Sequence, residues 1–139
     1  MKLLILNGPN LNLLGRREPE IYGNRNFEDY LVELKQHFRD IEFGYLQSNL
    51  EGELINALQA ADGNWDGIIF SPAGYSHTSV ALADTIAAVS TPVVEVHISN
   101  IHAREPFRQQ SLTARNSRGV IGGFGLDSYR LAVESFRIR

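Results

Sequence analysis

The sequence predicts an α/β domain built on a parallel sheet of five strands. Five short apolar runs are spread along the 139 residues, and segments with helical periodicity lie between them. This alternation is typical of a parallel sheet that helices cover on both faces. The chain has no internal repeat, linker or low-complexity tract, and its length suits one core. Residues 1–139 are therefore expected to form a single domain.

The predicted strands are short and apolar. The first reads Leu-Leu-Ile-Leu at 3–6, and this lack of polar alternation indicates a strand buried on both faces. An Asn-Gly-Pro-Asn turn at 7–10 ends it. The five predicted strands are residues 3–6, 43–47, 67–71, 92–97 and 120–123.

The first two predicted helices have clear boundary signals. Asn26 can cap the first helix, with Asp29 three residues later and apolar residues at helical spacing as far as Phe38. The second helix, Glu51–Ala61, begins with acidic side chains, which the helix dipole favours, and stops at Gly63.

The third predicted helix is almost wholly apolar. It spans residues 79–89, ends before Pro92, and carries Asp84 as its only charge. Because so little polar face exists, we expect this helix to pack against another protein surface, where Asp84 would find a partner. The alternative is that Asp84 is simply solvated. A last helix is predicted at 126–136.

The order of the predicted strands follows from handedness. Right-handed crossovers favour the order 2-1-3-4-5, a flavodoxin-like three-layer sandwich. Ligands of such sheets bind beyond the carboxyl ends of the strands, near the point where the strand order reverses. The segments expected there are 7–22, 71–77 and 95–104, which hold three of the four histidines. A pocket is therefore predicted where they converge.

Composition excludes several classes of function. The net charge is −3 and the basic residues are scattered, which argues against nucleic acid or an anionic membrane surface as partner. No apolar run approaches the ~20 residues needed to span a bilayer. The apolar run at residues 3–6 is too short for the core of a signal peptide. The absence of cysteine excludes disulfides and thiolate chemistry. We therefore expect a soluble cytoplasmic protein. The two lysines, Lys2 and Lys35, lie outside the converging segments, so Schiff-base chemistry has no candidate.

Glu95 and His97 are the strongest candidates for chemistry. They alternate along one predicted strand, so both side chains point to the same face. A carboxylate beside an imidazole fixes its tautomer and raises its basicity, which suits a general acid. The alternative is a buried ion pair that only holds the strand end. Because a charged pair on an apolar strand is costly, we favour the functional interpretation.

Other site chemistries have less support. His77, His97 and His102 match no familiar ligand spacing, and the nearby arginines oppose a cation, so no metal site is predicted. The glycine-rich run at 122–125 ends the last strand and lacks the acid of a dinucleotide fingerprint. Residues 72–79 contain no nucleophile elbow, although a capped helix start there could meet an oxygen-rich ligand.

Arg104 and Arg108 flank Pro106, which suits an early helical position. Their guanidinium groups could grip hydroxyls or a carboxylate. Surface salt bridging is the alternative, and for these two residues considered alone it is the preferred one.

Four motifs occur in order along the chain. They are NGPNLNLLGRREPEIYG at 7–23, QSNLEGELI at 47–55, HTSVAL at 77–82 and EVHISNIHARE at 95–105. With them the chain resembles the type II 3-dehydroquinate dehydratases over almost its full length. The resemblance implies a flavodoxin-like fold, no cofactor and a homododecamer built as a tetramer of trimers. It also implies reversible anti elimination of water from 3-dehydroquinate, giving 3-dehydroshikimate through an enolate, a step of the shikimate pathway.

The resemblance also assigns catalytic roles by position. Tyr22 would be the base that takes the proton next to the ketone, and Arg17 would lower its pKa. His97, oriented by Glu95, would protonate the departing hydroxyl. Asn10 would hold a water at the enolate oxygen.

The remaining assignments concern substrate binding. The resemblance places His77 and Arg108 at the ring hydroxyls, Ser99 and the main chain of Ile98 at the carboxylate, Arg104 on the tyrosine side of the pocket, and Asp84 in a neighbouring subunit's site. Some positions depart from the family pattern. Ser71 replaces a usual asparagine, Ala83 a frequent arginine, and Gln-Gln-Ser-Leu at 109–112 a usual His-His-Ser-Tyr.

Two other classes of function stay open. A non-catalytic module that binds a polyhydroxylated acid is favoured by the departure at Ser71. A hydrolase using His97 and a nearby serine is conceivable, but no nucleophile elbow supports it.

Overall fold

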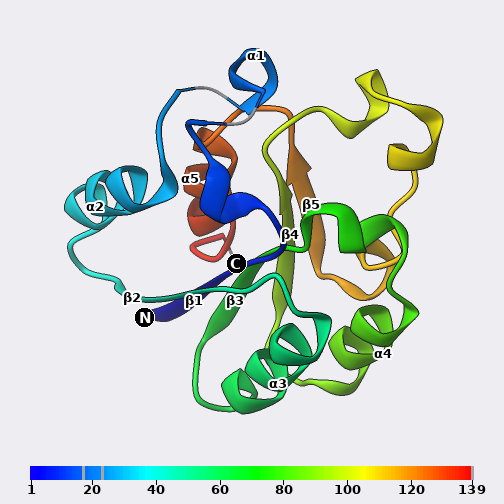
Figure 1. Ribbon diagram of the computed structural model, residues 1–139. Helices are drawn as coiled ribbons and strands as arrows, with labels where there is room; N and C mark the ends of the chain where they lie inside the picture. The colour runs from blue at the N-terminus through cyan, green and yellow to red at the C-terminus, as the bar shows by residue number, and fades with distance from the viewer. Residues whose placement is uncertain (17, 23, 139) are drawn as a thin grey trace.

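A parallel sheet runs through the middle of the protein, and helices cover both of its faces (Figure 1). The computed structural model describes residues 1–16, 18–22 and 24–138, apart from the side chains of Pro19 and Tyr22. Within these residues the sheet has the order β2-β1-β3-β4-β5, so the predicted order is confirmed. Its strands are β1 (Lys2–Asn7), β2 (Glu42–Gln47), β3 (Gly67–Ser71), β4 (Val93–His97) and β5 (Gly119–Gly122).

The α-helices of the described residues are α1 (Pro19–Tyr22), α2 (Phe27–His37), α3 (Glu51–Ala61), α4 (Val80–Ala88) and α5 (Asp127–Ser135). Short 3-10 turns connect them: η1 (Leu11–Leu13), η2 (Ala73–His77), η3 (Ile101–Ala103), η4 (Pro106–Arg108) and η5 (Ala114–Asn116). No helix in this part of the chain has the length and hydropathy that a bilayer crossing requires.

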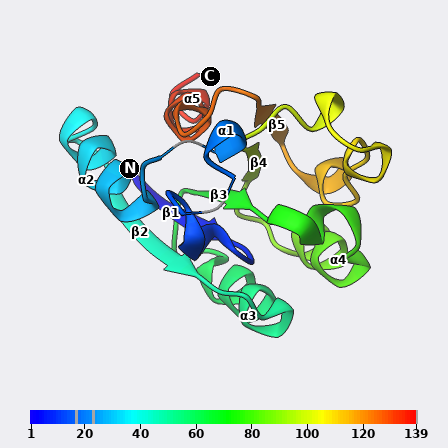
Figure 2. The same cartoon turned by 45° about the horizontal axis from the view of Figure 1, so that its top comes forward.

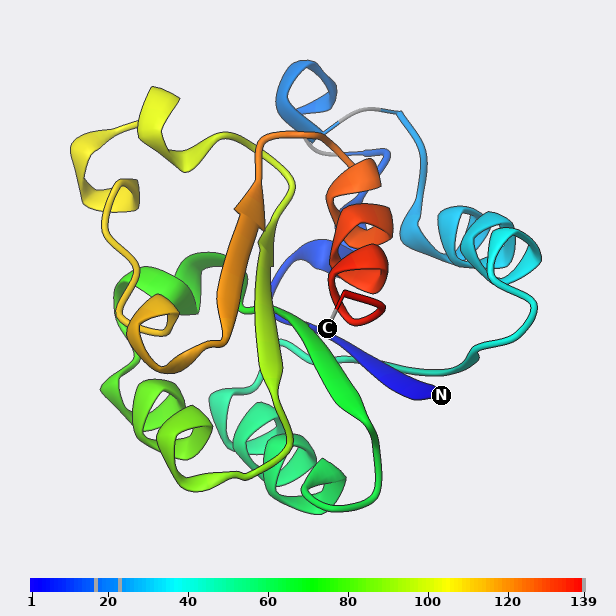
Figure 3. The same cartoon turned by 180° about the vertical axis from the view of Figure 1, so that it is seen from behind.

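Each face of the sheet has its own apolar core. On one face, Phe27 of α2 and Tyr129 of α5 belong to a buried cluster with Ile5 of β1. On the other face, Leu54 of α3 and Leu82 of α4 belong to a second buried cluster. The two helix pairs lie on opposite sides of the sheet in all three ribbon views (Figures 1–3). The three-layer α/β/α arrangement predicted from the sequence is therefore confirmed.

Local capping signals located the helices well. The Asn26 side chain accepts a hydrogen bond from Asp29 N at 2.8 Å at the start of α2, and α3 has the predicted bounds. The segment after the predicted turn at 7–10 also contains a short helix, α1, which the sequence analysis did not predict. Pro19 suits the first position of a helix, and Glu20 lies in its first turn, where the helix dipole favours an acid.

The strand register brings polar residues to one edge of the sheet. Asn7 pairs with Gln47 on one side and with Ser71 on the other, so these residues end their strands together. The chain after β1 passes very close to the chain after β3: Gly8 N donates to Ser71 O at 2.8 Å. A Cβ at Gly8 would lie 2.5 Å from the carbonyl oxygen of Pro72, so only glycine fits there. α1 lies over this edge (Figure 2).

Candidate functional site

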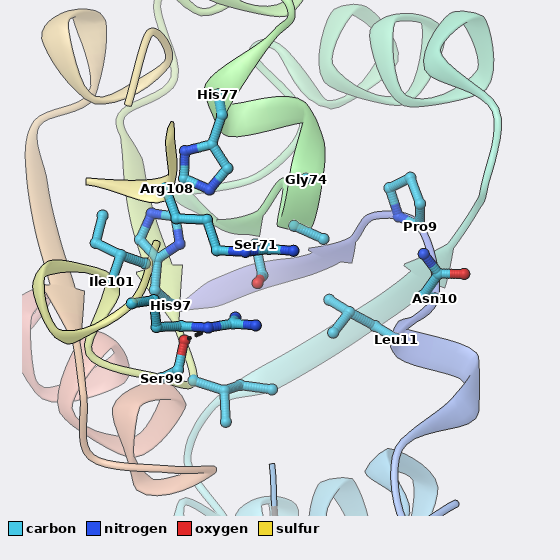
Figure 4. A pocket seen from close by; sticks show the side chains of 13 residues that line it. Pro9, Asn10, Leu11, Ser71, Gly74, His77, His97, Ser99, Ile101 and Arg108 are labelled. Atoms are coloured by element: carbon cyan, nitrogen blue, oxygen red, sulfur yellow. Dashed lines mark hydrogen bonds between the residues drawn. The ribbon is translucent and has the colours of Figure 1, made fainter. Parts of the chain in front are cut away.

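A cavity of about 120 Å³ opens at the carboxyl edge of the sheet. Segments following β1, β3 and β4 form its walls, as the topology predicts. In Figure 4, Pro9, Asn10 and Leu11 lie on one side, with His77, His97 and Arg108 opposite. Eight of the residues expected at the site line this cavity: Asn10, Ser71, His77, His97, Ile98, Ser99, Arg104 and Arg108.

Glu95 and His97 form a buried hydrogen-bonded pair at the end of β4. His97 Nε2 lies 2.7 Å from Glu95 Oε2, with the carboxylate 0% and the histidine 6% exposed. Burial alone would raise the pKa of Glu95. The hydrogen bond and charge of His97, with two hydroxyl donors, outweigh burial and hold this pKa below its ordinary value. An ionised Glu95 keeps a proton on Nε2 and leaves Nδ1 as the other ring nitrogen.

The two hydroxyl donors are Ser111 and Thr113, which the sequence analysis did not identify. Ser111 Oγ donates to Glu95 Oε2 at 2.7 Å, and Thr113 Oγ1 donates to Glu95 Oε1. Both residues lie between η4 and η5, outside any strand or helix. No periodic pattern points from this segment to β4, so the sequence carries no signal for these contacts.

His77 is held by the same segment. Its Nδ1 lies 2.7 Å from the carbonyl oxygen of Gln110, and its Nε2 lies 3.3 Å from Ser76 Oγ. The rings of His77 and His97 are nearly parallel, with an angle of 24° and a centroid distance of 6.3 Å. Two histidines therefore face one cavity from different elements.

The arginines give the cavity a positive character. Arg108 Nε donates to Glu105 Oε2 at 3.0 Å, and Arg104 Nη1 donates to Ser99 Oγ at 3.4 Å. Arg104 also lies 3.8 Å from Glu18 Oε2. No acidic side chain is among the described residues that line the cavity. Each arginine thus pairs with an acid and also lines the cavity, and its role in gripping a ligand stays a prediction.

Ser71 stands at the cavity floor, at the end of β3. It is 3% exposed and faces Asn7, whose Oδ1 accepts a hydrogen bond of 2.8 Å from the Tyr129 hydroxyl. Asn7 and Tyr129 are 0% exposed. The floor is therefore a buried polar layer, and the sequence analysis had treated Asn7 only as part of a turn.

The remaining predicted site residues are not gathered in the cavity by the described structure. Arg17 lies outside the described residues, as does the side chain of Tyr22, whose backbone ends α1. Asp84 is exposed on α4 and does not line the cavity, so its assignment to a neighbouring subunit's site stays a prediction. Asn10, by contrast, does line the cavity; its backbone is in the left-handed region (φ 71°), and its N–H donates to Asn49 Oδ1 at 3.0 Å.

The described residues hold no cluster of side chains suited to a metal ion. Among them, no three histidine, cysteine, aspartate or glutamate side chains are placed to hold an ion together.

Comparison with known proteins gives one consistent result. The family model described as dehydroquinase class II matches residues 1–137. A 3-dehydroquinate dehydratase from Exiguobacterium sp. is 52% identical over 136 residues, covering 97% of this chain and 93% of that protein. One from Photorhabdus laumondii is 48% identical over 135 residues, covering 96% and 90%.

A solved structure shares the fold closely. The type II dehydroquinase from Butyrivibrio crossotus superposes with a TM-score of 0.95 at 42% sequence identity, covering 99% of this chain and 98% of that one.

Proposed function

This chain belongs to the class II dehydroquinase family, and we propose that its hydro-lyase reaction, the dehydration of 3-dehydroquinate, runs through an enolate. In this proposal Tyr22 is the base and His97 the acid. The observation that carries it is the pair formed by His97 and the fully buried Glu95 in the wall of an arginine- and histidine-lined cavity.

The cavity suits a polyhydroxylated acid. A carboxylate prefers guanidinium groups and hydroxyl or main-chain donors, and two arginines, Ser99 and the main chain of Ile98 line the walls. His77 and Arg108, which also line the cavity, would bind ring hydroxyls. The absence of acidic side chains from the described lining avoids repulsion of the substrate's charge.

The base must remove a proton from carbon next to the ketone. A free tyrosine titrates near ~10, which is too high for a base at neutral pH. One cation ~4 Å from the phenolate, at an effective dielectric constant of ~20, is worth about 4 kcal/mol. That energy equals about three pKa units and would bring the phenol close to neutrality, where a general base works best. Arg17 would supply this charge, with Arg104 supporting the same side.

The acid must deliver a proton to the departing hydroxyl. His97 would deliver its proton from Nδ1, because its Nε2 is held by Glu95 and Nδ1 is the nitrogen left to face the substrate. Asn10 would hold a water at the enolate oxygen. Base and acid would thus act from opposite sides of the ring, which suits an anti elimination.

The proposal includes an assembly. The apolar helix α4 exposes Asp84, which would reach the site of a neighbouring subunit in a homododecamer built as a tetramer of trimers.

The decisive experiment is an ultraviolet assay for the conjugated enone product. Wild type should convert 3-dehydroquinate, and Tyr22→Phe should lose about 10²- to 10⁴-fold in kcat, the usual contribution of a general base. Tyr75→Phe is the matched control, because the Tyr75 hydroxyl donates to the Asn49 carbonyl and does not line the cavity.

Two outcomes would contradict the proposal. Binding of 3-dehydroquinate without turnover would favour the non-catalytic module. Full activity of Tyr22→Phe would show that another group removes the proton.

A further inference from the structure

The buried carboxylate of Glu95 has more partners than the histidine it orients. Its Oε2 lies 2.7 Å from both His97 Nε2 and Ser111 Oγ, and its Oε1 accepts from Thr113 Oγ1. Glu95 and Thr113 are both 0% exposed. The carboxylate itself is therefore shielded from solvent, and its contact with Thr113 is fully buried, whereas Ser111 is half-buried.

Such a carboxylate requires these donors. Leaving a charged oxygen buried without a hydrogen bond costs far more than leaving a neutral one, and His97 reaches only Oε2. Without the hydroxyl of Thr113, Glu95 would lose its contact on Oε1 and would gain by rotating or by taking up a proton. Either change would weaken its hold on the ring of His97.

The segment that supplies the donors is itself fixed. Ser111 Oγ and Thr113 Oγ1 lie 3.1 Å apart, and Ala114 N donates to Ser111 Oγ at 3.2 Å. Ser117 Oγ donates to the carbonyl oxygen of Thr113 at 3.0 Å. The backbone of Leu112 donates to the carbonyl oxygen of Ser76 at 2.7 Å, which ties the segment to η2.

The same segment contacts both histidines of the cavity. Gln110 holds His77 through its carbonyl oxygen, while Ser111 and Thr113 hold Glu95 and, through it, His97. The connection between β4 and β5 lies on the side of the molecule away from α2 (Figures 1 and 3). A stretch of four residues outside the sheet therefore sets the relative placement of two rings that face the substrate.

We propose that Thr113 and Ser111 are positioning residues that clamp the Glu95 carboxylate against His97 and so keep one ring nitrogen of His97 turned into the cavity. This inference rests on the proposed role of His97 as the acid. Neither hydroxyl lines the cavity, so their effect on the reaction passes entirely through Glu95.

Three variants test the clamp. Thr113→Val removes the hydroxyl with little change of shape and should lower kcat about 10-fold or more while KM changes less than about 3-fold, because the lost bond is to a charged group. Thr113→Ser restores the hydroxyl and should recover kcat to within about 3-fold. Ser117→Ala is the matched control, since its hydroxyl donates to Thr113 O and does not contact Glu95.

A second readout does not depend on activity. In ¹⁵N-histidine NMR spectra recorded at a pH where the histidine rings are neutral, with His97→Ala to assign the signal, wild type should show His97 as one tautomer with its proton on Nε2. Thr113→Val should show a mixture of tautomers, and Thr113→Ser and Ser117→Ala should match wild type. The NMR comparison tests the positioning role of Thr113 without any measurement of activity. If wild type failed to convert 3-dehydroquinate, that result would contradict the proposed function but not this inference.

Two results would overturn the inference. The first is a Thr113→Val protein that keeps both kcat and the single His97 tautomer. The second is an equal loss of kcat in Thr113→Val, Thr113→Ser and Ser117→Ala, which would indicate general loosening of the segment. If thermal unfolding shows that Thr113→Val does not fold, Ser111→Ala replaces it. Ser111 is half-buried, and this variant removes the hydrogen bond to Glu95 Oε2 in place of the one to Oε1.

Discussion

The two sides of the site are built in different ways. On the acid side, Glu95 and His97 belong to a central strand, are at most 6% exposed and are joined by a hydrogen bond of 2.7 Å. On the side of the proposed base, α1 is a single four-residue turn; Glu20 within it and Glu18 just before it are exposed. An ion pair of 3.8 Å joins Glu18, just before α1, to Arg104 in the cavity wall.

This difference indicates how each side works. The proposed acid, His97, has its geometry fixed by buried hydrogen bonds before substrate arrives, so substitutions around it should change how well the proton is delivered. The base depends on the charge of a group carried by a surface segment, so its substitutions should act on a pKa. The predictions below separate these two effects.

The largest effect is expected from the acid. His97→Ala should lower kcat about 10²- to 10⁴-fold, with a much smaller change in KM, because it removes the proposed proton donor and leaves the groups proposed to bind the carboxylate in place. His102→Ala is the control, since His102 is exposed and does not line the cavity. Steady-state kinetics on both variants make the comparison, and equal losses would argue against a specific role for His97.

A smaller but more diagnostic effect is expected from Arg17. In Arg17→Ala the ascending limb of the pH–rate profile should move up by about three pH units, the shift expected for loss of one adjacent cation. Arg16→Ala should move it far less. An unchanged limb in Arg17→Ala would mean that the base is not tuned by this arginine.

The sequence predicted the features that depend on local periodicity. Alternation along β4 placed Glu95 and His97 on one face, and the 2-1-3-4-5 order then brought residues of β1, β3 and β4 to one edge. Helix caps are equally local: Asn26 and Ser79 both accept the expected backbone hydrogen bonds. Fold and cavity could therefore be derived with no knowledge of the structure.

Contacts made by irregular segments could not be predicted in this way. Thr113 meets a carboxylate 18 residues away from a segment with no regular structure. Asn7 looked like a turn residue, but the parallel register pairs it with Ser71 of the cavity lining, and its side chain is buried against Tyr129. The role of Asp84 depends on what covers α4, which a single chain does not specify.

The smallest expected effect is on stability at high pH, and it comes from tyrosines of the core. These tyrosines form a contrast with the proposed base, Tyr22. Burial raises the pKa of Tyr45 to about 12, with a smaller opposing effect from Asn7, and burial also raises the pKa of Tyr129. The same side chain is thus proposed to titrate near neutrality at Tyr22 and far above it in the core. The environment alone would account for the difference.

The direction in which pH changes the stability follows from the pKa of Tyr45 in the folded and in the unfolded chain. Above pH 10 the phenol of Tyr45 ionises in the unfolded chain and stays protonated in the folded one, so the free energy of unfolding should fall between pH 10 and 12. Two pKa units correspond to about 2.7 kcal/mol. Between pH 10 and 12 the free energy of unfolding should therefore fall less in Tyr45→Phe than in wild type, with a difference of up to about 2.7 kcal/mol. In Tyr75→Phe it should fall as much as in wild type. Urea unfolding at pH 9, 11 and 12 measures the difference, and parallel losses in all three proteins would show that Tyr45 ionises as easily in the fold as in water.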